Sequence, residues 1–179
     1  MTGEETFHPD TRALLAYGRA LAGTGDAAPR QPAAKTDRLA ERLFVVDRLA
    51  DARLVVRTFG TELVTLFGAD LRDGDFAALW PIADRALLDA FVVAIGFAGQ
   101  PGIVRADALS ADGARFGAEI LLTPLHMPSG AADRYLGLFQ PLGGEAYAAD
   151  ALVALRLGAL YPPEARLPPP APRLVVSNG

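Results

Sequence analysis

Cysteine is absent from this sequence of 179 residues, and its absence excludes several kinds of chemistry. Disulfides, cysteine zinc fingers, iron–sulfur clusters, thiol nucleophiles and cysteinyl flavin adducts all require a thiol. Histidine is scarce too, because only His8 and His126 occur and no nucleophile pattern surrounds either of them. The usual hydrolase, nucleotide-binding, zinc-protease and kinase motifs are also missing from the sequence. We therefore expect neither a metal site nor an enzyme.

The sequence also lacks a long apolar run. The longest uncharged apolar stretch, Ala90 to Gly99, is well short of the roughly 20 residues that cross a bilayer. The first residues are acidic and no apolar segment follows them, unlike a secretory signal. The net charge of −4 argues against a nucleic-acid partner, which needs a basic face. These absences predict a cytoplasmic protein that binds neither membrane nor nucleic acid.

Apolar patterning is strong, since 51% of the residues are hydrophobic, and it predicts a packed core. Alternating runs predict strands, and spacings of three and four predict helices. We expect strands at residues 43–46, 53–59, 103–109, 115–125 and 134–140, and helices at residues 60–68, 76–80 and 82–98. This order predicts an α+β fold, in which a five-stranded antiparallel sheet carries its helices on one face.

The segment from Gly60 to Gly68 connects the second strand to the helices. Thr61 is suited to cap the short helix with its hydroxyl group, and Gly68 is suited to end it in a left-handed conformation. In the strand before it, alternation places Leu54, Val56 and Thr58 on one face. In the long helix of residues 82–98, the apolar face comprises Leu87, Leu88, Phe91, Val92 and Ile95, with Val93 and Phe97 alongside.

A leader helix and a tail flank this block, which gives three parts: residues 1–38, 39–142 and 143–179. The leader helix has a narrow apolar stripe made of Leu14, Leu15, Tyr17 and Leu21. An apolar stripe must be buried, so the helix either folds back on its own sheet or pairs with a second copy as a dimer interface. The pattern of the tail predicts a weak helix up to residue 160. The tail is then rich in proline, with six prolines in residues 161–172. It is either disordered or an arm held by a partner.

Three pieces of this block resemble a known family. They are Phe59-Gly60-Thr61-Glu62 with Leu66-Phe67-Gly68-Ala69-Asp70-Leu71, the paired strands before Pro124-Leu125, and Tyr135-Leu136-Gly137-Leu138 running into Pro141-Leu142. Together with the element order, they resemble PAS domain family 5, a family of small bacterial single-domain proteins. The resemblance covers about residues 39–142 and includes a similar leader helix. It implies a PAS fold and a role in signalling or regulation, and it supplies no catalytic residue.

Better-known PAS domains bind haem, flavin or small metabolites between the sheet and the long helix. Haem of the common sensor type needs an axial histidine on that helix, which has none. A photoactive flavin that forms an adduct needs the missing cysteine. A flavin bound without an adduct stays open, but no residue argues for it, so we expect no cofactor. A pocket for a small apolar ligand would be lined by Thr58, Trp80, Leu88, Phe91, Ile95, Phe116, Ala118 and Leu138, with Gln140 as a further polar group. The alternative is that these side chains simply fill the core.

Two functions follow from this reading. The first is a PAS-type sensory or regulatory module in bacterial signalling that acts through protein–protein contacts, either as a homodimer through the leader helix or with a signalling partner. The second is a sensor of a small apolar ligand. A small enzyme on the same fold would need two or more titratable groups converging in a cleft, and the sequence suggests no such set.

Overall fold

The structure is a computed structural model that describes residues 7–23, 39–125, 133–143 and 150–163. Within these residues one sheet has the strand order β2-β1-β5-β4-β3-β6, and every neighbouring pair is antiparallel. The strands are β1 (Leu43–Arg48), β2 (Leu54–Phe59), β3 (Gly102–Ser110), β4 (Arg115–Leu125), β5 (Arg134–Pro141) and β6 (Leu152–Tyr161). The predicted antiparallel α+β fold is therefore confirmed, with one strand more than expected.

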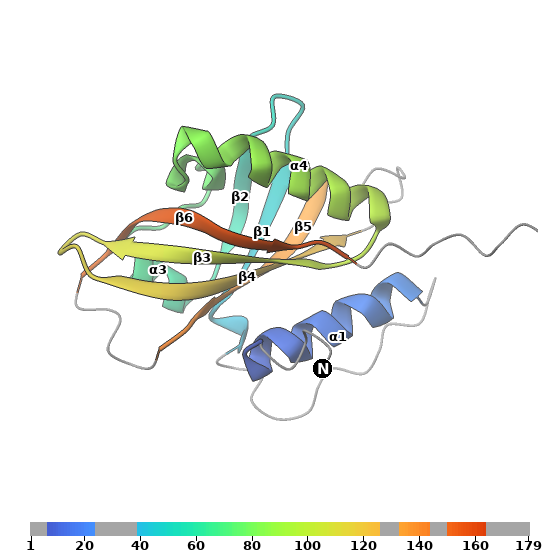
Figure 1. The fold of residues 1–179 in the computed structure, drawn as a ribbon, viewed down its shortest axis with the longest axis horizontal. Helices are drawn as coiled ribbons and strands as arrows, with labels where there is room; N and C mark the ends of the chain where they lie inside the picture. Colours follow the sequence, from blue (N-terminus) through green and yellow to red (C-terminus); the bar gives the residue numbers. More distant parts are fainter. Residues whose placement is uncertain (1–6, 24–38, 126–132, 144–149, 164–179) are drawn as a thin grey trace, which may run out of the picture.

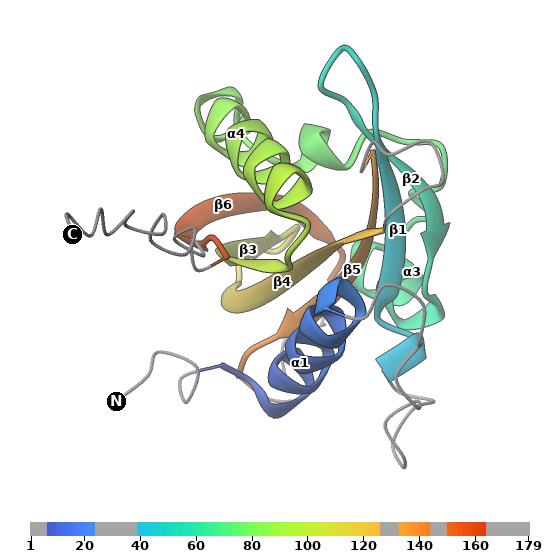
Figure 2. The same ribbon diagram turned by 90° about the vertical axis from the view of Figure 1, so that its right-hand side faces the viewer.

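Helices cover both faces of this sheet. They are α1 (Pro9–Gly23), α3 (Thr61–Phe67), the 3₁₀ helix η2 (Phe76–Leu79) and α4 (Ile82–Ala98). Figures 1 and 2 show α4 on one side of the sheet and α1 on the opposite side. The crossover from β2 to β3 runs through α3, η2 and α4, as the element order predicts.

The larger part of the core lies between α4 and the sheet. Alternate residues of β3 and β4, among them Ala106 and Ala118, face α4 with small side chains. The small residues let the helix approach closely: a Cβ atom on Gly102 would lie 2.7 Å from Cζ of Phe91. Leu88, Phe91, Val92 and Ile95 are the buried side chains of α4.

The remaining alternate residues form a second, smaller core on the other face. Ile103, Leu121 and Leu138 pack there against Leu14 and Leu15 of α1. Tyr17 packs against the same cluster while partly buried, and Leu21 is also partly buried. The structure thus favours the first interpretation of the leader helix, in which its apolar stripe covers its own sheet.

The sixth strand corrects the prediction of a weakly helical segment beyond residue 142. β6 pairs with β3, so the sheet continues to Tyr161. The register shifts twice along this pair, because Val153 and Gly158 have no partner in β3. Each β-bulge adds one residue and moves the inward-facing positions, so Leu152, Leu155 and Leu157 are not evenly spaced by two. In the sequence, apolar residues at such uneven intervals resemble the periodicity of a helix. The proline-rich remainder, residues 164–179, lies outside the described residues.

Glycines lie at both ends of α3 and at the C-terminal end of α4. Gly60 is the N-cap residue of α3 and no side chain caps this helix, so the prediction for Thr61 is wrong. Gly68 ends α3 with φ 64°, and Gly99 ends α4 with φ 62°, both in the left-handed region that glycine adopts without strain. Asp75 caps η2 by accepting a hydrogen bond from the backbone N–H of Ala77.

Candidate functional site

The space beneath α4, where a ligand pocket was predicted, is occupied by side chains. Trp80, Leu88, Phe91, Ile95 and Ala118 all belong to the main core cluster. Each of them is at most 4% exposed. The sixth predicted residue on this side, Phe116, packs against the same cluster while partly buried. The structure therefore brings six of the eight predicted residues together as packed core.

The other two predicted ligand residues lie elsewhere. Thr58 is exposed, because a bulge in β2 pairs Val45 with Thr58 but Val46 with Val56. The extra residue reverses the alternation, so Phe59 and not Thr58 packs toward the core. Leu138 is buried on the opposite face of the sheet, beneath α1. Both placements correct the prediction.

The polar groups expected near a ligand have different surroundings. Gln140 accepts a hydrogen bond from Arg42 at 3.1 Å and donates one to the carbonyl oxygen of Pro141. Trp80 is 1% exposed, and its indole Nε1–H has no acceptor among the described residues. A buried donor without a partner costs roughly 1–3 kcal/mol. Trp80 is therefore the one predicted ligand residue whose polar atom is still unsatisfied in the described structure.

A tyrosine of the last family motif, which was not predicted as a site residue, connects α4 to the sheet. The hydroxyl of Tyr135, on β5, donates to the carbonyl oxygen of Val92 at 3.2 Å. Burial raises the pKa of the Tyr135 phenol. The hydroxyl thus stays protonated at neutral pH and serves as a hydrogen-bond donor inside the core.

A cleft of about 360 Å³ opens between the β1–β2 turn and the N-terminal half of α4. Its lining residues are Asp51, Ala52, Arg53, Leu54, Asp75, Ala77, Arg85, Ala86, Leu88 and Asp89. All five charged side chains in it already have partners in the chain. Asp51 pairs with Arg53, Asp89 with Arg48, Arg85 donates to backbone carbonyls, and Asp75 accepts from two backbone N–H groups. These interactions hold the β1–β2 turn, η2 and the N-terminal half of α4 together at this corner of the fold.

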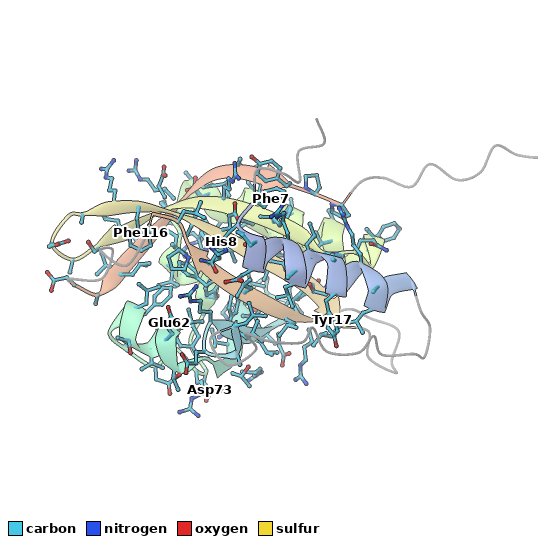
Figure 3. The ribbon with its side chains drawn as sticks, turned by 90° about the horizontal axis from the view of Figure 1, so that it is seen from below. Phe7, His8, Tyr17, Glu62, Asp73 and Phe116 are labelled. Atoms are coloured by element: carbon cyan, nitrogen blue, oxygen red, sulfur yellow. The ribbon has the colours of Figure 1, made fainter. Side chains whose placement is uncertain are left out.

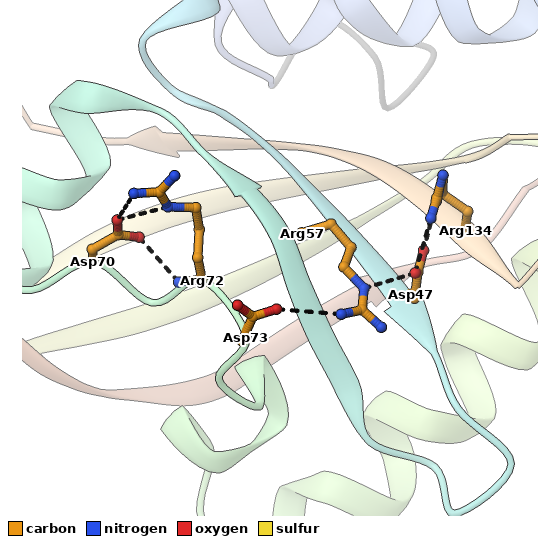
Figure 4. Close-up of polar contacts among 6 residues, drawn as sticks. All are labelled: Asp47, Arg57, Asp70, Arg72, Asp73 and Arg134. Atoms are coloured by element: carbon orange, nitrogen blue, oxygen red, sulfur yellow. Dashed lines mark hydrogen bonds and ion pairs between the residues drawn. The ribbon is translucent and has the colours of Figure 1, made fainter.

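A chain of ion pairs crosses the surface formed by β1, β2 and β5 (Figure 4). Asp47 accepts from Arg134 at 2.6 Å and from Arg57 at 2.8 Å, and Arg57 also reaches Asp73 at 3.3 Å. Its hydrogen bond to Arg134 is the main reason that the pKa of Asp47 lies below the usual value for aspartate. These pairs join three strands and the turn after α3, so their role is structural.

The motif residues that carried the family resemblance have similar structural roles. Glu62 forms an ion pair with Arg42 at 2.7 Å. Asp70 accepts from the backbone N–H of Arg72 at 3.0 Å and pairs with its side chain, as Figure 4 also shows. These contacts hold the start of α3 and the turn after it.

An ion pair with a buried glutamate lies beneath the start of α1, and sequence analysis missed it. Glu119 is fully buried and accepts from Arg105 at 3.0 Å and from the backbone N–H of His8 at 3.0 Å. The guanidinium carbon of Arg105 lies 5.0 Å from the ring centroid of Phe7 and 5.4 Å from that of Tyr161, and the two rings contact each other edge to face. Figure 3 shows Phe7 and His8 together at the start of α1. We call this group, Phe7, His8, Arg105, Glu119 and Tyr161, the α1 anchor.

Pairing within the β3–β4 hairpin brings part of the α1 anchor together, because Arg105 and Glu119 are directly opposite each other. Counting outward from a two-residue Asp112-Gly113 turn would instead set Ala106 opposite Glu119. The observed pairs, such as Leu109 with Arg115, are shifted by one residue from that count. The sequence could therefore not have paired the two charges, and it could not have shown the burial of Glu119 or its contact with His8.

The surface of α4 that faces away from the sheet is entirely apolar. We call it the outer α4 face, and its residues are Ile82, Ala83, Ala86, Leu87, Ala90, Val93, Ala94, Phe97 and Ala98. Phe97 is 96% exposed and Ile82 is 83% exposed. Among the described residues, four of the five large exposed hydrophobic side chains belong to this face, and the fifth is Val153 of β6.

Two strands, a helical crossover and three further strands in one antiparallel sheet define a protein of the PAS class. Residues 6–140 match the family model described as PAS domain, so the chain belongs to the PAS-domain family. Membership in this family makes it a sensory or signalling module. Among the described residues no group of three or more potential ligands could hold a metal ion. In that part of the chain, no helix combines the length and apolarity that crossing a membrane requires.

Solved structures similar to this chain include several light–oxygen–voltage (LOV) domains. The blue-light photoreceptor Aureochrome1 LOV is 20% identical, with a TM-score of 0.45, 65% of this chain covered and 93% of that one. The Rhodobacter sphaeroides LOV protein is 19% identical, with a TM-score of 0.48 and coverages of 61% and 65%. An RNA-binding LOV receptor is 17% identical, with a TM-score of 0.47 and coverages of 65% and 36%. No curated protein matches the sequence.

Proposed function

We propose that this PAS module regulates through contact with protein, either a copy of itself or a signalling partner, and has no catalytic step of its own. The observation that carries the proposal is the outer α4 face. Large apolar patches on a soluble domain mark interaction sites. The space beneath α4 is filled by side chains, and the charged groups of the neighbouring cleft are bonded within the chain.

The proposal keeps the bacterial cytoplasm as the expected location, in line with the family resemblance. It does not rely on a dimer through the leader helix. Leu14 and Leu15 are buried against the chain's own sheet, so pairing through them would first require α1 to leave that sheet.

A photo-crosslinking amino acid placed at Phe97 in the native host tests the proposal. We expect irradiation to attach a protein, identified by mass spectrometry, because this side chain is nearly fully exposed on the outer α4 face. The same amino acid at Ala16, an exposed position on α1, is the control. If position 97 gives no protein adduct beyond the level at position 16, contact through this face is refuted.

A specific observation favours a second candidate, the small-ligand sensor. The unsatisfied Nε1–H of Trp80 is a donor that a ligand acceptor would satisfy. Native mass spectrometry of protein purified from its own host tests this function. A sensor predicts a bound mass that is lost in Trp80→Phe, which removes the donor and keeps most of the ring. A wild-type spectrum with no bound mass would dismiss the ligand hypothesis.

A further inference from the structure

The charged residues of α4 all turn away from its outer face. Asp84 accepts from the backbone N–H of Leu157, Arg85 donates to the carbonyl oxygen of Trp80, and Asp89 pairs with Arg48. What remains exposed along the whole helix is apolar. α4 thus has two apolar sides, one toward the sheet and one away from it, and the described structure covers only the first.

The charge of the molecule indicates what covers this face. A helix that lies on a membrane surface usually carries lysine and arginine along its polar side. α4 has no lysine, its single arginine is bonded to a backbone carbonyl, and the chain carries a net charge of −4. An anionic membrane would repel such a molecule, whereas an uncharged protein surface would not. A second copy offers such a surface, because no exposed charge on either helix would face its counterpart.

The sizes of the side chains fit a second copy in antiparallel orientation. Ala90 lies at the middle of the outer α4 face, and helical periodicity distributes the other positions evenly on either side of it. A two-fold axis at Ala90 brings positions equally far from Ala90 to the same level and keeps each flank of one helix beside the same flank of the other. It would set Phe97 against Ala83, Leu87 against Ala94 and Val93 against Ala86. The positions follow from the period alone, but the matching of three large exposed side chains with alanines does not.

We propose that the outer α4 face is a homodimer interface, in which two α4 helices pack antiparallel about a two-fold axis at Ala90. This inference rests on the proposed function and names the partner as a second copy of the chain. Such an interface is isologous, so one patch serves both copies. The alanines at its centre permit the two helices to approach closely.

The area of the face predicts a reversible dimer. Seventeen residues make a helix about 25 Å long and roughly 10 Å wide. The surface that one such face buries is smaller than the roughly 800 Å² per partner of a standard stable interface. We therefore expect dimers at about 100 μM protein and monomers at nanomolar concentrations.

Charge substitutions at the axis test the proposal by sedimentation velocity on the full chain. In Ala90→Glu two carboxylates would meet across the axis, and in Ala90→Lys two ammonium groups would. We expect each variant to weaken dimerisation at least tenfold, and an equimolar mixture of the two to restore it. The matched control is Ala16→Glu, which adds the same charge at an exposed alanine of α1 and leaves the dimer unchanged.

Single cysteines test the geometry, because the chain has none of its own. At an interhelical distance of about 8–10 Å, the two Cα atoms of residue 90 would be roughly 4–5 Å apart, within reach of a disulfide. The two copies of residue 83 would be about 21 Å apart along the axis. We expect Ala90→Cys to form a covalent dimer in air at least ten times faster than Ala83→Cys or Ala16→Cys.

A wild-type protein that stays monomeric at several hundred micromolar would overturn the inference. So would Ala90→Cys dimers that form no faster than those of Ala16→Cys, or an Ala83→Cys variant that links as fast, which would indicate a parallel pair. If these tests fail while the cross-linker at position 97 captures a different protein in cells, the second copy is refuted and the proposed function stands.

Discussion

The two faces of the sheet are covered by helices that are held in different ways. α4 is held mainly by apolar side chains, with Tyr135 as a hydrogen-bonding donor at its centre. α1 is held by a smaller apolar cluster together with the α1 anchor, whose Glu119 is a fully buried charge. The cluster beneath α1 is the smaller of the two, so less apolar burial holds this helix in place. We therefore expect α4 to be a permanent part of the core and α1 to be the more separable element.

Matched leucine truncations provide the strongest test of this comparison, and the larger effect is expected on α4. Leu88→Ala removes a side chain that is 2% exposed in the main core. We expect a loss of about 2–5 kcal/mol in the free energy of unfolding, because the surrounding side chains cannot close the cavity. Urea denaturation measures this loss. A loss well below 1 kcal/mol would show that the α4 core is loosely packed.

Leu14→Ala makes the same change on the α1 face, where the leucine is 6% exposed. If α1 can leave the sheet while the remainder of the domain stays folded, the stability lost in Leu14→Ala cannot exceed the free energy that holds α1 on the sheet. We expect roughly 2–3 kcal/mol and, by amide hydrogen exchange, faster exchange in α1 with little change in β3 and β4. Equal loss of protection in α1 and the sheet would mean that the helix and the sheet unfold as one unit.

The sequence predicted the strands and helices of the fold well where their periodicity was regular. α4 and the β3–β4 hairpin have uninterrupted spacing, and both were predicted within a few residues. β6 was missed because two bulges made its inward-facing leucines unevenly spaced. Thr58 was misplaced for the same reason, since a bulge in β2 reversed the alternation. A bulge is set by pairing with another strand, so it is not visible in the periodicity of one segment.

The candidate site was harder to predict than the fold. Local spacing placed Leu88, Phe91 and Ile95 together correctly, but it could not show that their side chains fill the space beneath α4. It also assigned Leu87 and Phe97 to the buried side, whereas Leu87 is more than half exposed and Phe97 almost fully so. Because α4 has two apolar sides and only three charged residues between them, its periodicity does not indicate which side the sheet covers. The outer α4 face therefore became visible only in three dimensions.

Replacing the buried charge of the α1 anchor sharpens the comparison further. In Glu119→Gln the amide group would turn its N–H donor toward either Arg105 or the backbone N–H of His8. One donor would then face another, and we expect a loss of about 1–3 kcal/mol, with exchange accelerated at the start of α1. Asp89→Asn, which removes a half-exposed ion pair on the α4 side, is the control and should cost less. Unchanged exchange at the start of α1 in Glu119→Gln would show that the anchor does not hold this helix.

The smallest expected effect concerns the ion pairs of Figure 4, which belong to neither helix. Hydrogen bonding, chiefly to Arg134, holds the pKa of Asp47 below that of an unfolded aspartate, about 3.9. Its contribution is therefore fully present above about pH 4 and is lost as the pH falls through the folded pKa. We expect Asp47→Asn to lower the free energy of unfolding by less than about 1 kcal/mol at pH 7, and the difference from the wild type to shrink toward pH 2.5.

Urea denaturation across this pH range, with and without 1 M salt, measures the effect of Asp47. Asp70→Asn is a matched control, because Asp70 pairs with Arg72 only two residues away, on an exposed part of the turn. A local pair of this kind joins no separate elements, so its removal should change stability less than Asp47→Asn does. If the deficit of Asp47→Asn were the same at pH 2.5 as at pH 7, charge could not be its cause. The ion pairs would then act through packing, and the sheet would depend on the same kind of interaction as α4.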